Sequence, residues 1–495
     1  MNTSSEIFGF DAINLADLIR TKQLSPVEVI EAALTQISTY DSEFHAFCTL
    51  VPELARGAAL RVEKSILAGD PQGPLAGLPV AIKDLVCTKG IRTTFGSKLY
   101  ADYIPEEDDI AVERLTAAGA IVVGKTNVAE LGYGAVGHNL LFPTTRNPWN
   151  PNLTSGGSSA GSAVAVATAM TPLAVGSDGG GSIRIPAALC GVVGMKASMG
   201  RVPLYPGCRD ETLPGASGWE SIEHIGPLAG TVRDAALMLS VMAGPDDRDR
   251  HSLPLADFDW LAVCEGDIKG LRVAYSPDWT GTPVDPEVVT IVASAAKVFE
   301  SELGCNVEMV SPDFDKWAWA FLPLVMQETD LSGMRALIAN RNTDISPSVL
   351  EMLKRPWSAE DLTDATIARK AVVNRMWRLM QRFDLLITPT VATAAFPVGL
   401  MGPKTINGRV VGAQDWTPFT WPMNFTGQPA VSIPVGFTET GLPVGLQIAG
   451  RHLDDAGVLR AAAAFEKVRP WQRWQGRSGH RVSGALSNAG FSSVE

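Results

Sequence analysis

The apolar residues near the start of the chain follow the spacing of an amphipathic helix. Ser25 stands where an N-cap belongs, Pro26 occupies the first helical position and Glu28 the third, and together they form a capping box. Apolar side chains between residues 29 and 34 then recur at helical intervals. The pattern predicts a helix that begins at Pro26, within a helical N-terminal region that covers residues 1–70.

From residue 75 the pattern changes to short, continuous apolar runs that end in turns. Such runs are typical of strands covered on both faces, and they occur at residues 77–84, 120–125, 431–435 and 443–448. A helix is predicted from Ala111 to about Gly119, between the first two strands, and a closing helix over residues 454–468. This succession of strands and helices predicts an α/β fold.

The chain contains no linker rich in Pro, Ser or charge that separates two self-contained patterns. We therefore expect one domain over residues 1–495. Its core covers 75–235, a mostly helical region at 313–382 covers the sheet, and 383–475 supplies late strands and the closing helix. The small apolar run 163–176 is shorter than the roughly 18–20 residues that cross a bilayer, so a buried helix and no membrane span are predicted there.

Charge and cysteine content narrow the possible partners. The 41 Lys and Arg residues against 53 Asp and Glu residues give a formal charge of −12, which repels a phosphate backbone, so nucleic acid is not expected as a general partner. The N-terminus has early acidic residues and no apolar signal core, which indicates a cytoplasmic protein. Six scattered cysteines, none in a CxxC pair, predict reduced thiols and no zinc site: Cys48, Cys87, Cys190, Cys208, Cys264 and Cys305.

Two glycine- and serine-rich segments carry the most specific chemical signal. Residues 154–162 read TSGGSSAGS and residues 175–186 read VGSDGGGSIRIP. Glycines allow close backbone approaches, so such loops can direct several N–H groups at one atom. A phosphate could be held in this way, but a P-loop ends in Gly-Lys-Ser or Gly-Lys-Thr, and neither segment contains a lysine.

These segments resemble the signature of the amidase signature family, which runs GGSS(G/A)GS, then Gly-x-Asp-x-GGS-(I/V)-R-x-P-A, then GVVG-x-K. Residues 191–196 read GVVGMK, and residues 79–84, PVAIKD, are similar to the family's lysine strand. Further similar segments extend over most of the chain, at residues 124–127, 224–229, 386–390 and 424–430. The resemblance implies a central, mixed, twisted β-sheet covered by helices on both faces.

By motif position, the resemblance places the family's nucleophile on Ser182, its cis-peptide serine on Ser158 and its lysine on Lys83. The two serines are 24 residues apart, a separation that fits a loop, a buried helix and a second loop that returns to the same place. A neutral lysine, desolvated at the end of its apolar strand, would act as the base. Ser158 would relay protons between Ser182 and Lys83 and then to the departing nitrogen.

Other residues near these positions are expected to support the site. The backbone N–H groups of the second loop are candidates for an oxyanion hole, namely Gly179, Gly180, Gly181 and Ser182. We expect Ser159, Ser177, Asp178 and Arg184 to shape the loops around the site, with Arg184 paired to a nearby acid. Candidate substrate-pocket residues are Tyr133, Trp317 and Trp319. His138 and His224 lack a GxSxG nucleophile elbow and are interpreted as structural.

The resemblance implies a hydrolase that cleaves C–N bonds of amides, anilides, hydrazides or carbamates through an acyl-enzyme, with activity that rises toward alkaline pH. The expected partner is a small amide-type molecule, with an apolar or aromatic acyl group, and no metal or organic cofactor is required. A homodimer is compatible with the family. Two other functions stay open: the amidase (glutaminase) subunit of a tRNA-dependent amidotransferase, and a catalytically silent binding protein.

Overall fold

A computed structural model describes residues 7, 9, 11–206, 212–216 and 219–476. The outermost residues of the expected domain 1–495 and Cys208 lie outside these ranges. Within them the central sheet has 11 strands, in the order β1-β3-β2-β4-β6-β5-β12-β13-β9-β7-β8, and β10 and β11 form a separate hairpin. The strands are β1 (Phe47–Leu50), β2 (Pro79–Lys83), β3 (Ile121–Thr126), β4 (Leu173–Ser177), β5 (Val193–Lys196), β6 (Ile225–Ala229), β7 (Arg272–Tyr275), β8 (Asn306–Met309), β9 (Leu385–Pro389), β10 (Thr405–Ile406), β11 (Arg409–Val410), β12 (Ala430–Phe437) and β13 (Pro443–Gly450).

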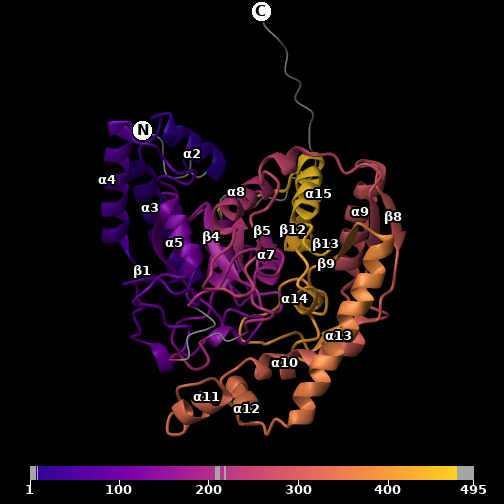
Figure 1. Cartoon of the computed structure of the whole chain (residues 1–495). Helices are drawn as coiled ribbons and strands as arrows, with labels where there is room; N and C mark the ends of the chain where they lie inside the picture. The colour runs from indigo at the N-terminus through magenta and orange to yellow at the C-terminus, as the bar shows by residue number, and fades with distance from the viewer. Residues whose placement is uncertain (1–6, 8, 10, 207–211, 217–218, 477–495) are drawn as a thin grey trace, which may run out of the picture.

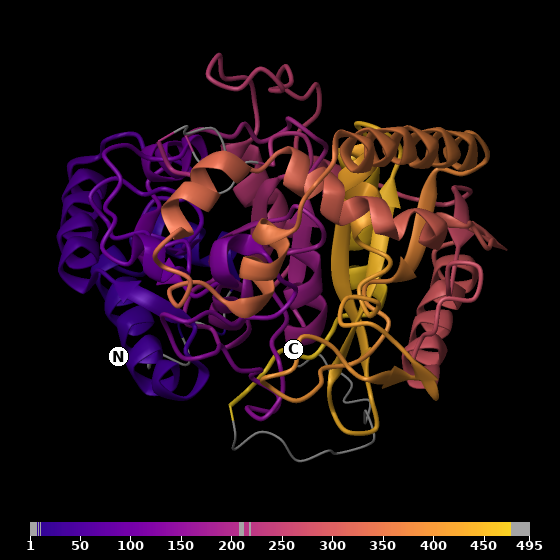
Figure 2. The same cartoon turned by 90° about the horizontal axis from the view of Figure 1, so that it is seen from below.

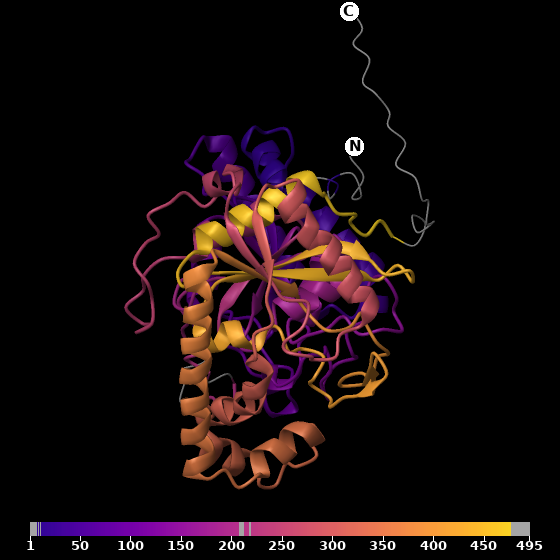
Figure 3. The same ribbon diagram turned by 90° about the vertical axis from the view of Figure 1, so that its right-hand side faces the viewer.

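The sheet is mixed. Strand β2 runs parallel to both β3 and β4, whereas β4 and β5 are antiparallel to β6, and β12 is antiparallel to β5 and β13. Figure 3 shows the strands fanned about one another, which is the twist expected of a large sheet. The predicted α/β class and the mixed, twisted sheet are confirmed.

Helices cover the sheet on both faces and extend beyond it (Figure 1). In Figure 1, α3 and α4 lie at one end of the molecule and α13 at the other, with α10 to α12 below. The helices are α2 (Ala12–Arg20), α3 (Pro26–Phe44), α4 (Pro52–Ala68), α5 (Ile110–Ala117), α6 (Ala160–Ala167), α7 (Arg184–Cys190), α8 (Val232–Met242), α9 (Pro286–Ser301), α10 (Phe321–Gln327), α11 (Leu331–Ile338), α12 (Pro347–Lys354), α13 (Ala359–Arg382), α14 (Trp421–Thr426) and α15 (Asp455–Val468), with 3-10 turns η1 (Lys98–Tyr100), η2 (Glu130–Gly132), η4 (Ala262–Glu265) and η5 (Phe314–Ala320).

The predicted start of α3 is confirmed in detail. The side chain of Ser25 accepts a hydrogen bond from the Val27 N–H at 3.0 Å, and the carboxylate of Glu28 accepts one from the Ser25 N–H at 3.0 Å. The strand, helix, strand succession of β2, α5 and β3 is also present, with β2 parallel to β3.

The prediction of one buried helix over residues 163–176 is wrong. Helix α6 ends at Ala167, and the second half of the run forms strand β4. Between them Ala169 adopts a left-handed backbone conformation with φ of 55°, and Pro172 precedes the strand and cannot donate a hydrogen bond that would continue the helix. The run is short and its residues are mostly small. The spacing of their side chains therefore does not distinguish a helix from a strand.

Side chains of β2 alternate between two cores. Val80 and Ile82 belong to the apolar cluster on the face that packs α8 and α15, whereas Ala81 belongs to the cluster with α3, α6 and α7. Lys83 is two residues beyond Ala81 and so shares its face, because side chains alternate along a strand. The packing therefore turns the last side chain of β2 toward the helices α6 and α7. Among the described residues, no helix has the length and apolar character needed to cross a membrane.

Candidate active site

The candidate residues come from loops and strand ends that meet at one edge of the sheet. Lys83 ends β2 and Ser177 ends the neighbouring parallel strand β4. Ser158 lies just before α6, and Ser182 just before α7. Because the carboxyl ends of adjacent parallel strands open at the same edge, the residues that follow them are brought together.

Lys83 is completely buried and is held by two serines. Its Nζ lies 2.8 Å from Oγ of Ser158, 2.8 Å from Oγ of Ser177 and 3.1 Å from the Ser177 carbonyl oxygen. Two of the three residues assigned by motif position, Lys83 and Ser158, are thus in direct contact although 75 positions separate them in the sequence.

The third residue, Ser182, is tied to the same loop through the backbone. The N–H of Ser159 donates a hydrogen bond of 3.1 Å to the Ser182 carbonyl oxygen. The Gly157–Ser158 peptide bond is cis, as the resemblance implied. Ser159 also contacts Ser177, with its Oγ 3.2 Å from the Ser177 carbonyl oxygen. The two serine loops therefore form one unit beside Lys83.

The first two glycines of the second loop are packed against aromatic rings. A Cβ atom on Gly179 would lie 2.6 Å from the ring of Trp219, and one on Gly180 would lie 2.4 Å from Cζ of Phe321. Both distances are far below ordinary carbon–carbon contact. The sequence requires glycine here because any side chain would displace the loop or the rings.

The third glycine is fixed by hydrogen bonds and by its conformation. Gly181 has φ of 129°, a region that residues with a Cβ rarely adopt, and a Cβ there would lie 2.4 Å from Oγ1 of Thr420. The Thr420 hydroxyl donates 2.7 Å to the carbonyl oxygen of Gly180. The Gly181 N–H donates 2.7 Å to Oδ1 of Asp178. The Gly181 N–H, one of the four predicted oxyanion donors, is therefore already used in a hydrogen bond to Asp178.

Asp178 and Arg184 form a fully buried ion pair beneath the loop. The guanidinium donates to both carboxylate oxygens, at 2.8 and 2.9 Å, and Asp178 also accepts from the side-chain amide of Asn424 at 2.9 Å. Burial alone would raise the pKa of Asp178, but the charge and hydrogen bonds of Arg184 and the Asn424 contact hold it well below its usual value. The expectation that Arg184 pairs with an acid is confirmed.

Known proteins are similar to this chain over nearly its whole length. The amidase family model matches residues 28–459. An acylamidase of Rhodococcus erythropolis is 38% identical over 481 residues, 95% of this chain and 97% of the relative. A solved structure of a bacterial aryl acylamidase of the amidase signature enzymes family superposes with a TM-score of 0.85 at 30% identity, over 95% of this chain and 96% of the other.

The chain belongs to the amidase family. It is an amidohydrolase of the amidase signature type, which acts on carbon–nitrogen bonds other than peptide bonds. A Glutamyl-tRNA(Gln) amidotransferase subunit of Thermosynechococcus vestitus is also similar, 36% identical over 92% of this chain and 97% of the relative. The family thus includes both kinds of enzyme that the sequence left open.

Two of the three predicted pocket residues, Trp317 and Trp319, are not the aromatic residues that contact the glycine loop. Tyr133 stands edge-on to Trp219, with ring centroids 4.9 Å apart. Trp319 is 52% exposed, and Trp317 packs under the guanidinium of Arg375, 5.5 Å from it. The rings that the glycine loop meets are instead Trp219 and the Phe321 at the start of α10. Figure 2 shows α10 to α12 lying across the middle of the molecule as seen from below.

A buried carboxylate beside the amidase site was not predicted. Glu223 is 4% exposed, and its Oε2 lies 2.8 Å from where a Cβ atom on Gly179 would be. Burial raises the pKa of Glu223 to about 6, while the positive charge of Lys83 acts to lower it. Residues 224–229 are part of the family resemblance, but nothing in the local sequence indicates that Glu223 lies near Lys83.

The two histidines occupy structural positions. His224 is buried, and its Nδ1 lies 2.8 Å from the Ile222 carbonyl oxygen. Burial lowers the pKa of His224 well below its ordinary value, with the charge of Lys196 acting in the same direction. His138 is exposed, and its Nδ1 lies 3.0 Å from Oγ1 of Thr144. Among the described residues, no group of three or more His, Cys, Asp or Glu side chains is placed to hold a metal ion.

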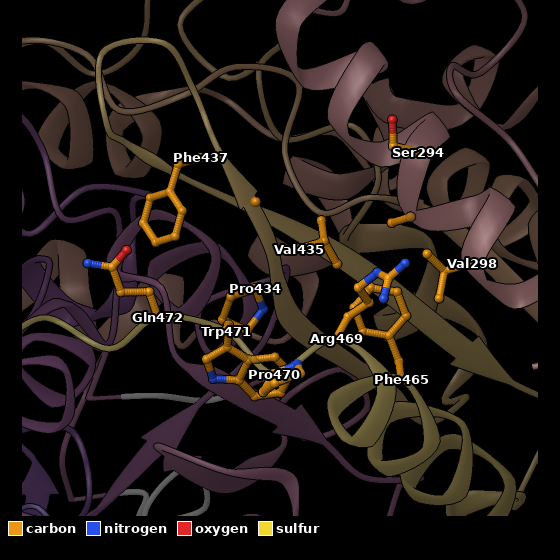
Figure 4. A pocket seen from close by; sticks show the side chains of 12 residues that line it. Ser294, Val298, Pro434, Val435, Phe437, Phe465, Arg469, Pro470, Trp471 and Gln472 are labelled. Carbon is orange, nitrogen blue, oxygen red and sulfur yellow. The ribbon is translucent and has the colours of Figure 1, made fainter. Parts of the chain in front are cut away.

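A separate cavity of about 290 Å³ lies between α9, β12 and the segment after α15 (Figure 4). Its wall includes Pro434, Val435, Phe437, Phe465 and Trp471, which are apolar or aromatic. None of the serines or the lysine described above lines it. We therefore place the chemistry at the sheet edge and not in this cavity.

Proposed function

We propose that this amidase hydrolyses amides of apolar or aromatic acyl groups through the catalytic residues Lys83, Ser158 and Ser182, as an enzyme that needs no partner protein. The observation that carries the proposal is the 2.8 Å contact between the buried Lys83 Nζ and the Ser158 hydroxyl. The bond from Ser159 N–H to the Ser182 carbonyl supports it, because it joins the loop of the proposed nucleophile to this pair.

The proposed reaction begins with a neutral Lys83. Ser158 gives its proton to Lys83 and takes one from Ser182, whose oxygen attacks the amide carbon. The proton then passes back through Ser158 to the departing nitrogen, since an amine leaves poorly unless it is protonated. Water hydrolyses the resulting ester on Ser182 by the same route in reverse.

The developing oxyanion needs donors that are already in place. The N–H groups of Gly179, Gly180 and Ser182 are the proposed donors, because Asp178 occupies that of Gly181. Thr420 supports the arrangement by binding the Gly180 carbonyl oxygen. Ser159, Ser177 and Arg184 act indirectly, by holding the loops in which these donors lie.

The preference for apolar or aromatic acyl groups rests on the rings beside the loop. Trp219, Phe321 and Tyr133 form an apolar wall, joined in the same cluster by Val325 and Met326. Burial of an aryl or branched acyl group against such a wall is favourable, at about 25 cal/mol for each Å² of apolar surface removed from water. The names of two relatives, an acylamidase and an aryl acylamidase, agree with this choice.

The second candidate is a component of a tRNA-dependent amidotransferase, favoured by the 36% identity to the Glutamyl-tRNA(Gln) amidotransferase relative. A component of this kind releases ammonia from glutamine and needs partner proteins. The purified chain assayed alone separates the two candidates. Turnover of aryl amides that exceeds glutamine hydrolysis supports a stand-alone amidase, and glutamine hydrolysis that appears only with partner proteins supports the other.

The catalytic assignment is tested with p-nitroanilides, primary amides, hydrazides and carbamates. Ser182→Ala and Lys83→Ala are each expected to lower kcat by roughly 10⁴-fold or more, whereas the exposed Ser38 on α3 provides a control variant, Ser38→Ala, with wild-type kcat. The kcat/KM of the wild type should rise toward alkaline pH, because the base must lose its proton. Near-normal turnover in either site variant would show the mechanism to be wrong.

A further inference from the structure

Arg369 on α13 binds two segments that support the apolar wall beside the glycine loop. Its Nε donates 2.9 Å to the Phe425 carbonyl oxygen on α14. Its two terminal nitrogens donate 2.6 Å to the hydroxyl and 2.7 Å to the carbonyl oxygen of Ser221. Neither Arg369 nor its partners take part in the reaction described above, so that reaction does not explain why a half-buried cation stands here.

Ser221 lies inside the turn that carries the Trp219 ring. The N–H groups of Ile222 and Glu223 both donate to the Trp219 carbonyl oxygen, at 3.1 and 2.8 Å, so residues 219–223 form one turn. The Arg369 bonds hold the middle of this turn. The Trp219 side chain is 6% exposed, and its ring occupies the space where a side chain on Gly179 would be. The place of this ring over the glycine loop therefore depends on Ser221.

The other half of the wall, helix α10, is held at both of its ends. The N–H of Ser221 donates 2.8 Å to the carboxylate of Glu328, which follows α10, and the Ser221 hydroxyl donates to the same carboxylate. At the start of α10 the Phe321 ring is stacked on that of Phe425, with centroids 6.1 Å apart. Helix α13, which carries Arg369, packs against both α10 and α14 (Figure 1).

The chemistry of these contacts suits arginine. The Ser221 hydroxyl accepts from the guanidinium and donates to the Glu328 carboxylate, so both of its bonds are to charged groups and are stronger than neutral ones. The planar guanidinium reaches three oxygen atoms on two segments at once, which the single ammonium of a lysine cannot do in the same geometry. Arg369, Ser221 and Glu328 therefore form one clamp between α13, α10 and the Trp219 turn.

We propose that Arg369 is a positioning residue that sets the acyl preference of this amidase, and that the preferred acyl group is aromatic. Through Ser221 and Phe425 it holds Trp219 and Phe321 in one arrangement over the glycine loop. An aromatic acyl group gains from packing against such fixed rings in addition to the area that it buries, whereas an acetyl group reaches little of the wall. The inference rests on the proposed function, since an acyl preference requires that amides are cleaved at this site.

Two p-nitroanilides with the same leaving group, one acetyl and one benzoyl, measure the acyl preference. Arg369→Gln removes the cation and should lower the benzoyl-to-acetyl ratio of kcat/KM by about tenfold, the effect of losing a contact the size of one methylene group. Arg369→Lys keeps the charge without the planar fork, and Ser221→Ala keeps the bond of Arg369 to the Ser221 carbonyl oxygen. Each should lower the ratio by less than Arg369→Gln does. A general loss of structure would instead lower kcat/KM for both substrates equally.

The exposed Arg378 on the same helix provides the control variant Arg378→Gln, whose ratio should equal that of the wild type. A wild type that cleaves both anilides without preferring benzoyl, or cleaves neither, overturns the proposed function and this inference with it. A wild type that prefers benzoyl while Arg369→Gln keeps the full ratio overturns this inference alone. Where Arg369→Gln does not fold, an unchanged ratio in Ser221→Ala overturns it in the same way.

Discussion

Substitution of Gly180 by alanine tests whether the position of the glycine loop depends on the ring above it. The φ angle of Gly180 is not in the left-handed region, so alanine is penalised here only by space. The added methyl would lie 2.4 Å from Cζ of Phe321, about 1 Å closer than carbon atoms normally approach. Either the ring or the loop must move by about that distance.

A displacement of about 1 Å in a catalytic group costs roughly 100-fold in rate. We therefore expect Gly180→Ala to lower kcat for p-nitroacetanilide by about 100-fold, with the protein still folded because the ring is half-buried at the start of α10. In a Phe321→Ala background the methyl has room, and the same substitution should cost less than about threefold. Comparing the two backgrounds cancels any direct loss of substrate contact that Phe321→Ala itself causes.

The control for the methyl group itself is Gly57→Ala in α4. There the added Cβ would meet only the end of Arg61, at 3.5 Å, which is ordinary contact. Alanine should raise the free energy of unfolding by roughly 0.5–1 kcal/mol, since glycine is unfavourable inside a helix, and leave kcat unchanged. Equal losses of kcat for Gly180→Ala in both backgrounds would refute the steric argument.

Two further predictions concern stability, measured by urea denaturation. Arg184→Met leaves the charge of Asp178 buried without its partner and should cost roughly 3–5 kcal/mol; Asp178→Asn combined with it should recover part of this loss, and strict additivity of the two changes would contradict a coupled pair. Ser25→Ala removes the cap of α3 and should cost about 1 kcal/mol without an effect on kcat, so an unchanged midpoint would show that the cap contributes nothing.

Features governed by neighbouring residues were predictable from the sequence. The capping box at Ser25 and the strand that ends at Lys83 follow from local spacing, and both are present. The contact of Lys83 with Ser158 was predicted from the motif, because each motif segment contributes a residue to the same place. The run 163–176 was not resolved correctly, since small residues fit a buried helix and a buried strand equally well.

Contacts between distant segments depend on how their strands pair, and local sequence patterns do not predict that pairing. Glu223 comes beside Gly179 because β4 and β6 pair antiparallel, and no local pattern reports which residues stand opposite each other. The pocket assignment illustrates the same limit. Trp317 and Trp319 have the composition of a pocket wall, but the rings beside Gly179 and Gly180 are Trp219, in the segment before β6, and Phe321, at the start of α10.

The buried polar groups near the proposed catalytic residues form two sets that are adjacent in the chain. One set, the framework, holds the glycine loop in place, and the other belongs to the proposed proton relay. Arg184 joins Asp178 to the Thr420 carbonyl and Asn424 at α14 and to Gln447 on β13, so two distant segments fix the loop before any substrate arrives. Donors held in this way need no rearrangement as negative charge develops, and such preorganisation makes an oxyanion hole effective. The proposed proton relay lies beside this framework, because Ser177, whose hydroxyl is 2.8 Å from Lys83 Nζ, directly precedes Asp178 in the chain. Changes to Trp219 or Phe321 should therefore alter the acyl preference while the framework stays intact, because neither ring contributes a hydrogen bond to it.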